Sequence, residues 1–304
     1  MILVKQMAVF FLMILMGMIA RKRKYITEDN IRNFSAIVVD IANPALILYG
    51  SIAGTEKIPL RTFGLYGLVA VGIFAFFMLI GFGFDHLPGN KEKVYSLMLV
   101  FSNIGFMGMP LVRAMYGENA LIYVTLFEIP FNLLIYTYGV LRLSGTKKPG
   151  AWRKNLNIGT VISVLAVVLY FTEIDFPDVI IDTTRMLSDI TAPLSMMIIG
   201  ASIPGIFRMG LVRDRNLILF TVFKMIILPA AGMLILSQVL EDQTFIGVCF
   251  IMIAAPAASM NTMMSAQYGS KEDFETATKG VALTTVVSLF SVPLLGLIFG
   301  GQSL

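Results

Sequence analysis

Long apolar runs alternate with short polar connections along the whole chain. Ten runs have the length and apolarity of transmembrane helices, since about 20 apolar residues are needed to cross the hydrocarbon core of a bilayer. They cover residues 2–20, 32–53, 62–83, 94–116, 119–141, 156–172, 180–204, 216–238, 243–267 and 276–299. The pattern predicts an all-α integral membrane protein with ten transmembrane helices.

The composition agrees with a chain that lies in a membrane. Hydrophobic residues make up 57% of it, charged residues 14%, and the mean hydropathy is +0.82, well outside the usual balance of a soluble domain. The first apolar run is long and ends in the basic stretch 21–24, so we expect a transmembrane helix and no cleavable signal peptide. The longest polar stretch, about residues 142–155, is too short to fold by itself.

Basic residues are concentrated on every second connection. The opposite connections hold only Lys57 and Arg61 as basic residues. By the positive-inside rule the basic side is cytoplasmic, which puts the central loop inside and both termini outside a plasma (inner) membrane. This topology accounts for the sequence pI of about 9.1, so the charge gives no support for nucleic-acid binding. The basic side carries Arg21–Lys24, Lys91, Lys93, Arg142, Lys147, Lys148, Arg153, Lys154, Arg208, Arg213, Arg215 and Lys271.

Two apolar runs carry the same arrangement of an acid followed four residues later by a proline. Asp40 precedes Pro44 in the second run, and Asp189 precedes Pro193 in the seventh run, 149 positions further on. Because the second copy lies five spans after the first, an odd number, the two copies face opposite ways in the membrane. The pattern therefore predicts a 5+5 inverted repeat, an arrangement found in many secondary transporters. The first repeat is then 1–141, the cytoplasmic linker 142–155 and the second repeat 156–304.

The fourth and ninth runs contain residues that interrupt helices. In the fourth run Gly105, Gly108 and Pro110 lie close together, and in the ninth Pro256 lies among alanines. Proline lacks a backbone donor and glycine loses more backbone entropy than other residues, so we expect both helices to break at these places. Broken backbone at membrane depth is tolerated where it is buried in protein or lines a cavity. A plain proline kink without a ligand is the alternative interpretation.

Breaks of this kind would expose backbone amides near Gly108–Pro110 and near Ala258–Ser259, at the start of each second half-helix. The N-terminus of a helix favours an anion, and neutral side chains, Ser102 among them, add hydrogen bonds. The two segments therefore predict a pocket for a carboxylate or a similar group. Its candidate residues are Asn103, Gly105, Gly108, Pro110, Pro256, Ser259, Asn261 and Thr262.

The order and spacing of these motifs resemble those of the auxin efflux carrier family over essentially the whole chain. The likeness rests on Asn103-x-Gly105-x-x-Gly108-x-Pro110, on the Ala-Pro-Ala run that leads to Asn261, and on the Asn-Pro of the second span. The family includes plant auxin carriers and bacterial malate or malonate permeases. The resemblance implies a fold similar to bile-acid symporters and sodium/proton antiporters. In that fold spans 1, 2, 6 and 7 form a scaffold, and spans 3–5 and 8–10 form a transport domain. The substrate would lie where broken helices 4 and 9 cross.

Two charged residues lie in the middle of predicted spans, Glu128 in the fifth and Lys224 in the eighth. A buried lysine needs a partner or must lose its proton, and we expect Glu128 to be this partner. The pair would be either a proton or cation support site or a structural ion pair between two helices. The sequence leaves both readings open.

Asp189, Asp40 and Arg113 also lie inside predicted spans. Asp189 has Arg185 one helical turn before it, a spacing that permits an ion pair within the helix. Asp40 has no such neighbour, so a role facing the cleft or binding a proton is open for it, and both acids are candidate coupling or support residues. Arg113 either neutralises an anion near the outer mouth or extends to the membrane interface, and we favour the interface.

Together these features predict a secondary transporter for a small organic anion such as malate, malonate or an auxin-like acid, working by elevator-type alternating access. The alternative is a symporter or antiporter of the same fold coupled to Na⁺ or H⁺. We expect no enzyme activity, because the motifs of membrane metalloproteases and serine hydrolases are absent. No cofactor or metal is expected, since His86 and Cys249 are each single in the chain. The expected partners are the anion, H⁺ or Na⁺, the bilayer and a second copy in a homodimer.

Overall fold

The computed structural model describes residues 2–53, 57–85, 93–145, 158–172, 174–206 and 214–303. Within these ranges the chain is helical, with one isolated antiparallel bridge between Ser102 and Ala257. The all-α prediction is therefore confirmed for this part of the chain. His86 and most of the predicted linker, from residue 146 on, lie outside the described residues.

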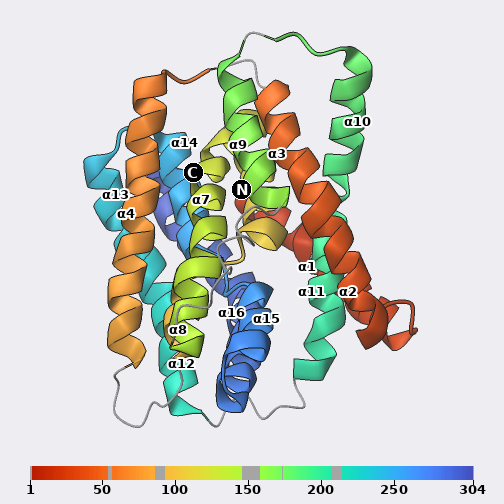
Figure 1. Cartoon of the computed structure of the whole chain (residues 1–304), viewed down its shortest axis with the longest axis vertical. Helices are drawn as coiled ribbons and strands as arrows, with labels where there is room; N and C mark the ends of the chain where they lie inside the picture. The colour runs from red at the N-terminus through yellow and green to blue at the C-terminus, as the bar shows by residue number, and fades with distance from the viewer. Residues whose placement is uncertain are drawn as a thin grey trace. The chain divides into compact units, whose positions relative to one another are not determined.

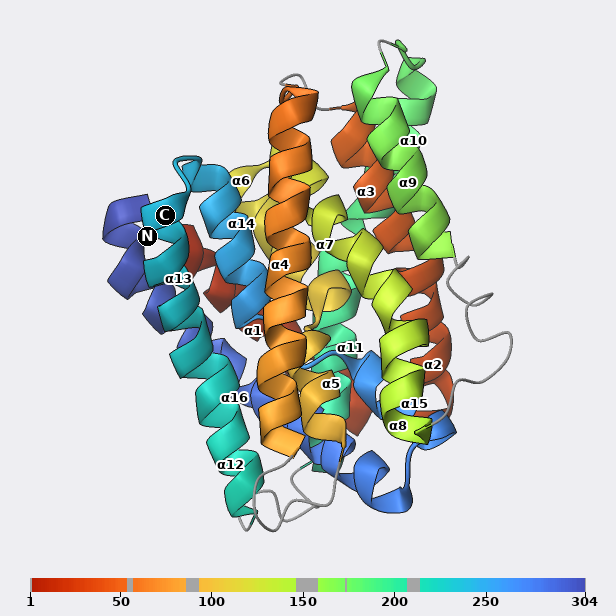
Figure 2. The ribbon, with the colours of Figure 1, turned by 60° about the vertical axis from the view of Figure 1, so that its left-hand side comes forward.

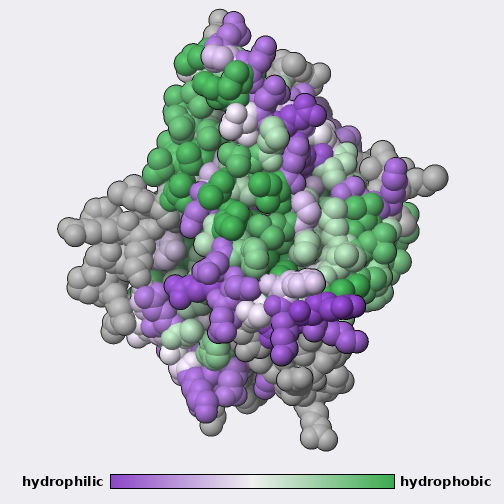
Figure 3. Space-filling view, turned by 90° about the vertical axis from the view of Figure 1, so that its right-hand side faces the viewer, coloured by the Kyte–Doolittle hydropathy of each residue, from purple (hydrophilic) through white to green (hydrophobic). Residues whose placement is uncertain are grey.

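Six helical runs of the described residues are long and apolar enough to cross a membrane: Asp29–Ile52, Leu60–Phe84, Glu118–Ser144, Asp178–Ile203, Arg215–Val239 and Lys271–Phe299. Their outer faces carry large apolar side chains, such as Leu68 (71% exposed), Leu79 (76%) and Val239 (72%). Figure 3 shows one face of the molecule, on which hydrophobic residues form broad areas of the surface. Apolar areas of this extent are rare on soluble monomers and typical of a surface that meets lipid. The chain is thus an integral membrane protein with several spans, and the ten-span count stays a prediction.

The helices form two compact units, each with its own core. The first consists of Met1–Tyr66, Gly105–Ile129 and Asn157–Arg208, and the second of Gly67–Ile104, Pro130–Leu156 and Met209–Leu304. Three elements continue from one unit into the other: α4 (Leu60–Asp85), the π-helical turn η2 (Ile104–Gly108) and α7 (Leu121–Leu134).

The first unit is held together by a very close contact between α1 (Ile2–Lys22) and α11 (Thr191–Ile206). A Cβ on Gly17 would overlap the backbone of Met197, and a Cβ on Gly200 would overlap the backbone of Ile14. Small residues allow this approach, which membrane helices use because lipid gives no hydrophobic drive for association. The remaining elements of this unit are α2 (Glu28–Ile37), η1 (Val38–Ala42), α3 (Asn43–Ile52), α6 (Met109–Tyr116), η3 (Glu118–Ala120), α9 (Ile158–Phe171) and α10 (Asp178–Asp189).

In the same unit α3 packs against both α9 and α10, and Figures 1 and 2 show the three helices side by side. The connection before α4 is attached to the end of α9. The hydroxyl of Tyr170 accepts a hydrogen bond from the amide of Ile58 (2.8 Å), and Nζ of Lys57 donates to the carbonyl of Thr172 (2.7 Å). Sequence-distant spans are thereby joined by polar contacts at the end of the helices.

The second unit is built around the long helix α16 (Lys271–Ser303), which packs against α5, α12, η8, α14 and α15. A Cβ on Gly280 would overlap the side chain of Met98, so the absence of a side chain lets α16 approach α5 closely. Figure 2 shows α12 and α13 following each other as one rod. The elements are α5 (Val94–Val100), η4 (Ile135–Gly139), α8 (Val140–Ser144), α12 (Arg215–Val222), η8 (Phe223–Ile227), α13 (Leu228–Val239), α14 (Gln243–Ala254) and α15 (Ser259–Tyr268).

Three π-helical turns, η1, η2 and η8, each end two residues before a proline: Pro44, Pro110 and Pro229. Proline lacks the amide for the usual hydrogen bond, and its ring clashes with the carbonyl four residues earlier. A wider turn before the proline relieves that clash, and such turns occur often at functional sites. Asp40 lies in η1 and Lys224 in η8, so two of the intramembrane charges lie in these turns.

Candidate functional site

The ninth predicted span is broken at the expected place. α14 ends at Ala254 and α15 begins at Ser259, with Pro256 in the segment between them. The residues on both sides of this segment, Ala255 and Ala258, have extended backbone angles. The prediction of a helix break at this proline is confirmed.

The fourth predicted span is also broken, but not where we expected. α5 ends at Val100 and the non-helical segment is Phe101–Asn103, whereas the chain from Gly105 to Pro110 is helical. The predicted break at these glycines and this proline, with exposed amides near Gly108, is wrong. Pro110 is tolerated because it lies at the start of α6 behind η2, where its missing amide costs little.

The two breaks bind each other through their backbones in the second unit. The amide of Asn103 donates to the carbonyl of Pro256 (2.7 Å), and the amide of Ala258 donates to the carbonyl of Phe101 (2.9 Å). Nδ2 of Asn261 adds a third bond to the Phe101 carbonyl (2.9 Å). Unwound backbone needs partners in a buried setting, and here each break supplies them to the other. We call this the crossing: residues 101–103 with 255–258.

Two side chains from neighbouring helices complete the crossing. Oγ1 of Thr284 on α16 accepts the amide of Ala257 (3.1 Å). Lys224 is fully buried, and its Nζ donates to Oγ of Ser102 (2.9 Å) and to the carbonyl of Leu99 (3.3 Å). The last carbonyls of a helix lack intrahelical donors and carry partial negative charge. The ammonium of Lys224 therefore meets the negative end of α5.

Thr284 could not be found from the sequence, because a threonine on a long apolar helix carries no distinguishing pattern. Glu128 is the partner that we predicted for Lys224. Glu128 is buried and belongs to the first unit, while Lys224 belongs to the second. Their pairing stays a prediction.

The start of α15 offers backbone donors. Its N-cap residue, Ala258, has no side chain that could cap the helix, and the first residue, Ser259, is exposed. Thr262 is half-buried one turn further on. Asn261 is fully buried, and its Oδ1 has no hydrogen-bond partner among the described residues. The start of α15 thus combines the uncapped amides of its first residues, Ser259 and Met260, with one unused acceptor, as a polar ligand site requires.

The other candidate residues, Gly105, Gly108 and Pro110, belong to the first unit. A Cβ on Gly105 would lie 2.6 Å from Nδ2 of Asn43, so glycine makes room here for an amide side chain. Asn43 is buried, and its Oδ1 has no partner among the residues that the structure describes. In this unit Gly105 serves close packing against α3.

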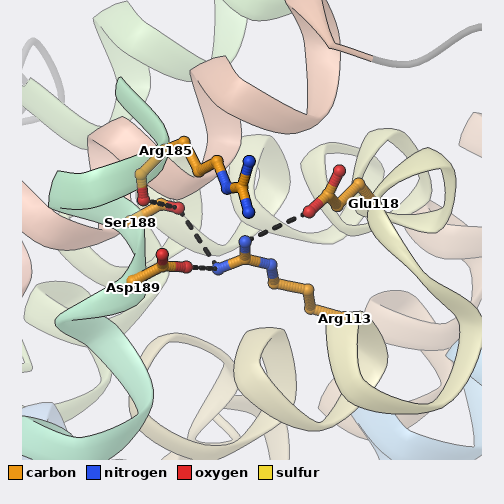
Figure 4. A network of polar contacts seen from close by, with 5 residues as sticks. All are labelled: Arg113, Glu118, Arg185, Ser188 and Asp189. Atoms are coloured by element: carbon orange, nitrogen blue, oxygen red, sulfur yellow. Dashed lines mark hydrogen bonds and ion pairs between the residues drawn. The ribbon is translucent and has the colours of Figure 1, made fainter. Parts of the chain in front are cut away.

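The first unit also contains a charge network that Figure 4 shows. The guanidinium of Arg113 donates to the carboxylates of Asp189 (2.7 Å) and Glu118 (3.1 Å) and to the hydroxyl of Ser188 (3.2 Å). The same guanidinium lies over the ring of Tyr49. Arg113 therefore joins α6 to α10, and its position at the membrane interface stays a prediction.

The charge of Asp189 is balanced, although not by Arg185. Within the described ranges its carboxylate pairs with Arg113, a residue of the first predicted repeat. Asp40 is exposed and has neither a hydrogen bond nor an ion pair to another described residue. The two acids that looked alike in sequence thus have different surroundings.

An α-helical membrane protein in which two broken helices meet at a buried lysine has the features of the transporter class. A family model described as "Membrane transport protein" matches residues 2–295. The chain belongs to this family, and its resemblance to the auxin efflux carriers is confirmed. The uncharacterized transporter MJ1031 of Methanocaldococcus jannaschii is 23% identical, over 95% of this chain and 96% of that one. Family and relative both point to a transporter and not to an enzyme.

Proposed function

We propose that the chain is a secondary transporter that moves a small organic anion, a carboxylate such as malate, malonate or an auxin-like acid, across the plasma membrane. The observation that carries the proposal is the uncapped start of α15, which follows a crossing that the fully buried Lys224 holds through Ser102. Free amides at a helix N-terminus bind carboxylates, and Ser259 and Thr262 add hydroxyl groups. A site made largely of neutral donors suits a carrier that must also release its cargo.

The proposed mechanism is elevator-type alternating access in a ten-span, 5+5 inverted repeat with both termini outside. In this proposal spans 1, 2, 6 and 7 are the scaffold and the other spans carry the substrate. It is supported by the fact that both breaks, Lys224 and α15 belong to one compact unit. The hydrogen bonds of the crossing lie within this unit, so the unit could move without breaking them.

A second candidate function is transport coupled to Na⁺ or H⁺. Assembly into a homodimer is compatible with either function. Two observations favour the coupling: the partnerless Oδ1 of the buried Asn261 and the exposed carboxylate of Asp40 in an apolar span. A buried acceptor without a donor costs about 1–3 kcal/mol, which a cation or a protonated substrate would recover. Glu128 and Asp189 are further support residues in this proposal.

The test is thermal unfolding of the purified protein with a panel of dicarboxylates, monocarboxylates and indole acids. A ligand at 100 times its dissociation constant stabilises the folded state by about 2.7 kcal/mol. We expect Thr262→Val to lose part of the shift and Thr278→Val to keep it, because Thr278 bonds only along its own helix. No shift with any organic anion would contradict the proposal. Uptake into liposomes with and without a Na⁺ or H⁺ gradient then separates the two candidates.

A further inference from the structure

The second unit has a groove that the proposed transport does not use. It encloses about 460 Å³. One wall is formed by α4 between Val69 and Ile80, the other by η8 and α13 between Phe223 and Leu236. Ile253 of α14 lies between the two walls.

The groove exists because α4 packs tightly against α12 and η8 only near its C-terminal end. Away from that end, small residues line the two helices: Gly72 on α4, and Ala231 and Gly232 on α13. The ring of Phe84 packs against Phe223, with centroids 4.9 Å apart, and against Phe220 at 5.7 Å. Beyond this contact, a Cβ on Gly72 would have no atom within 4 Å. The hollow is therefore part of how the two helices pack.

The lining excludes polar ligands. It consists of valine, isoleucine, leucine, phenylalanine, alanine and glycine side chains, with neither a charged nor a hydrogen-bonding group. A carboxylate placed there would lose its hydration without gaining a partner. The groove is thus unsuited to the organic anion proposed above, and its occupant has to be apolar.

Its surroundings and its length indicate which apolar molecule fills it. Both walls belong to membrane-spanning runs whose outer side chains, such as Leu79 and Leu234, are exposed to lipid. At 1.5 Å per residue the walls extend for about 16 and 20 Å. One leaflet of the hydrocarbon core is about 15 Å thick. The groove is continuous with the lipid-facing surface and has the length of one extended acyl chain.

We propose that this groove binds one acyl chain of a bilayer phospholipid. The chain is recognised by shape and apolarity, and the headgroup does not contribute, because the lining offers it no polar contact. The bound chain fills the space between α4 and α13. It thereby packs against η8, the turn that contains Lys224, and against Ile253 of α14. This inference does not depend on which substrate is transported.

The test uses the full chain in nanodiscs that contain a phospholipid with a photoactivatable acyl chain. Peptide mapping after irradiation should find label concentrated on residues 69–80 and 223–236. Gly72→Leu places a side chain in the groove and removes room for roughly two methylenes, which should lower the labelling about tenfold. Gly83→Leu is the matched control, since a Cβ at Gly83 also has no neighbour within 4 Å but Gly83 does not line the groove.

Ala231→Phe, on the opposite wall, should lower the labelling as Gly72→Leu does, which protects the test against one variant that does not fold. Exchanging phosphatidylethanolamine for phosphatidylglycerol should leave the labelling unchanged. Equal labelling of the wild type and both groove variants would overturn the proposal. So would labelling that follows the headgroup.

Discussion

The hydrogen bond between Lys224 and Ser102 gives the sharpest test of the crossing. Lys224→Met removes the ammonium while keeping an unbranched side chain, and Ser102→Ala removes the hydroxyl. The single change at Lys224 combines two opposite effects on the free energy of unfolding. It removes two hydrogen bonds, which destabilises the protein, and it removes the cost of burying a charged group, which stabilises it. A double-mutant cycle cancels these separate effects and leaves the interaction between the two side chains.

The expected size of this interaction follows from the geometry. Nζ and Oγ are 2.9 Å apart, Lys224 is 0% exposed and Ser102 is 3% exposed. A hydrogen bond to a charged group contributes about 1.5–3 kcal/mol to stability, so the cycle should give a coupling free energy in that range. The measurement is the free energy of unfolding in detergent by chemical denaturation for the wild type, both single variants and the double variant.

Ser265→Ala is the matched control for the cycle. Ser265 is as buried as Ser102, but its hydroxyl donates to the carbonyl of Asn261 along its own helix. The effects of Lys224→Met and Ser265→Ala should therefore add. A coupling below about 0.5 kcal/mol between Lys224 and Ser102 would show that the lysine does not hold the crossing, and the reasoning would be refuted.

Two further predictions concern packing and the second support of the crossing. Gly17→Ala should destabilise the protein by about 1–3 kcal/mol because its Cβ overlaps the α11 backbone. Gly83→Ala should stabilise it by up to about 1 kcal/mol through helix propensity. If both variants shift the melting temperature in the same direction, the close contact between α1 and α11 is contradicted. Thr284→Val should cost about 1–3 kcal/mol, since the buried amide of Ala257 loses its acceptor. Thr285→Val should cost less, because that hydroxyl only donates within its own helix, and equal losses of unfolding free energy would rule out the Thr284 contact.

Some features of the site were readable from single residues. Pro256 cannot donate to a helical ladder, so the break after α14 could be predicted without knowing any contact. Lys224 and Asp189 could be singled out as groups in need of partners, because a charge in an apolar run is costly, and both have partners in the structure. The family assignment likewise depended on the order and spacing of Asn103, Pro110 and Asn261 along the chain.

The partners of these residues were not readable in the same way. The spacing of Arg185 and Asp189 favoured a local ion pair, yet the carboxylate pairs with Arg113, 76 positions away. The fourth span breaks at Phe101–Asn103, ahead of its glycines and proline, because the carbonyl of Phe101 and the amide of Asn103 find hydrogen-bond partners on the ninth span. In both cases a contact between distant segments outweighs the local pattern.

Local properties of the chain are enough to give the solvent, the helical class, the family and the presence of charged residues that need partners. These follow from hydropathy and from the backbone limits of proline, which act locally. Which groups satisfy one another depends on the folded chain: Lys224 bonds to the end of α5, Arg113 pairs with Asp189, and Thr284 accepts from the break before α15. A buried polar group needs some partner at about 3 Å, but its own sequence neighbourhood does not specify which one.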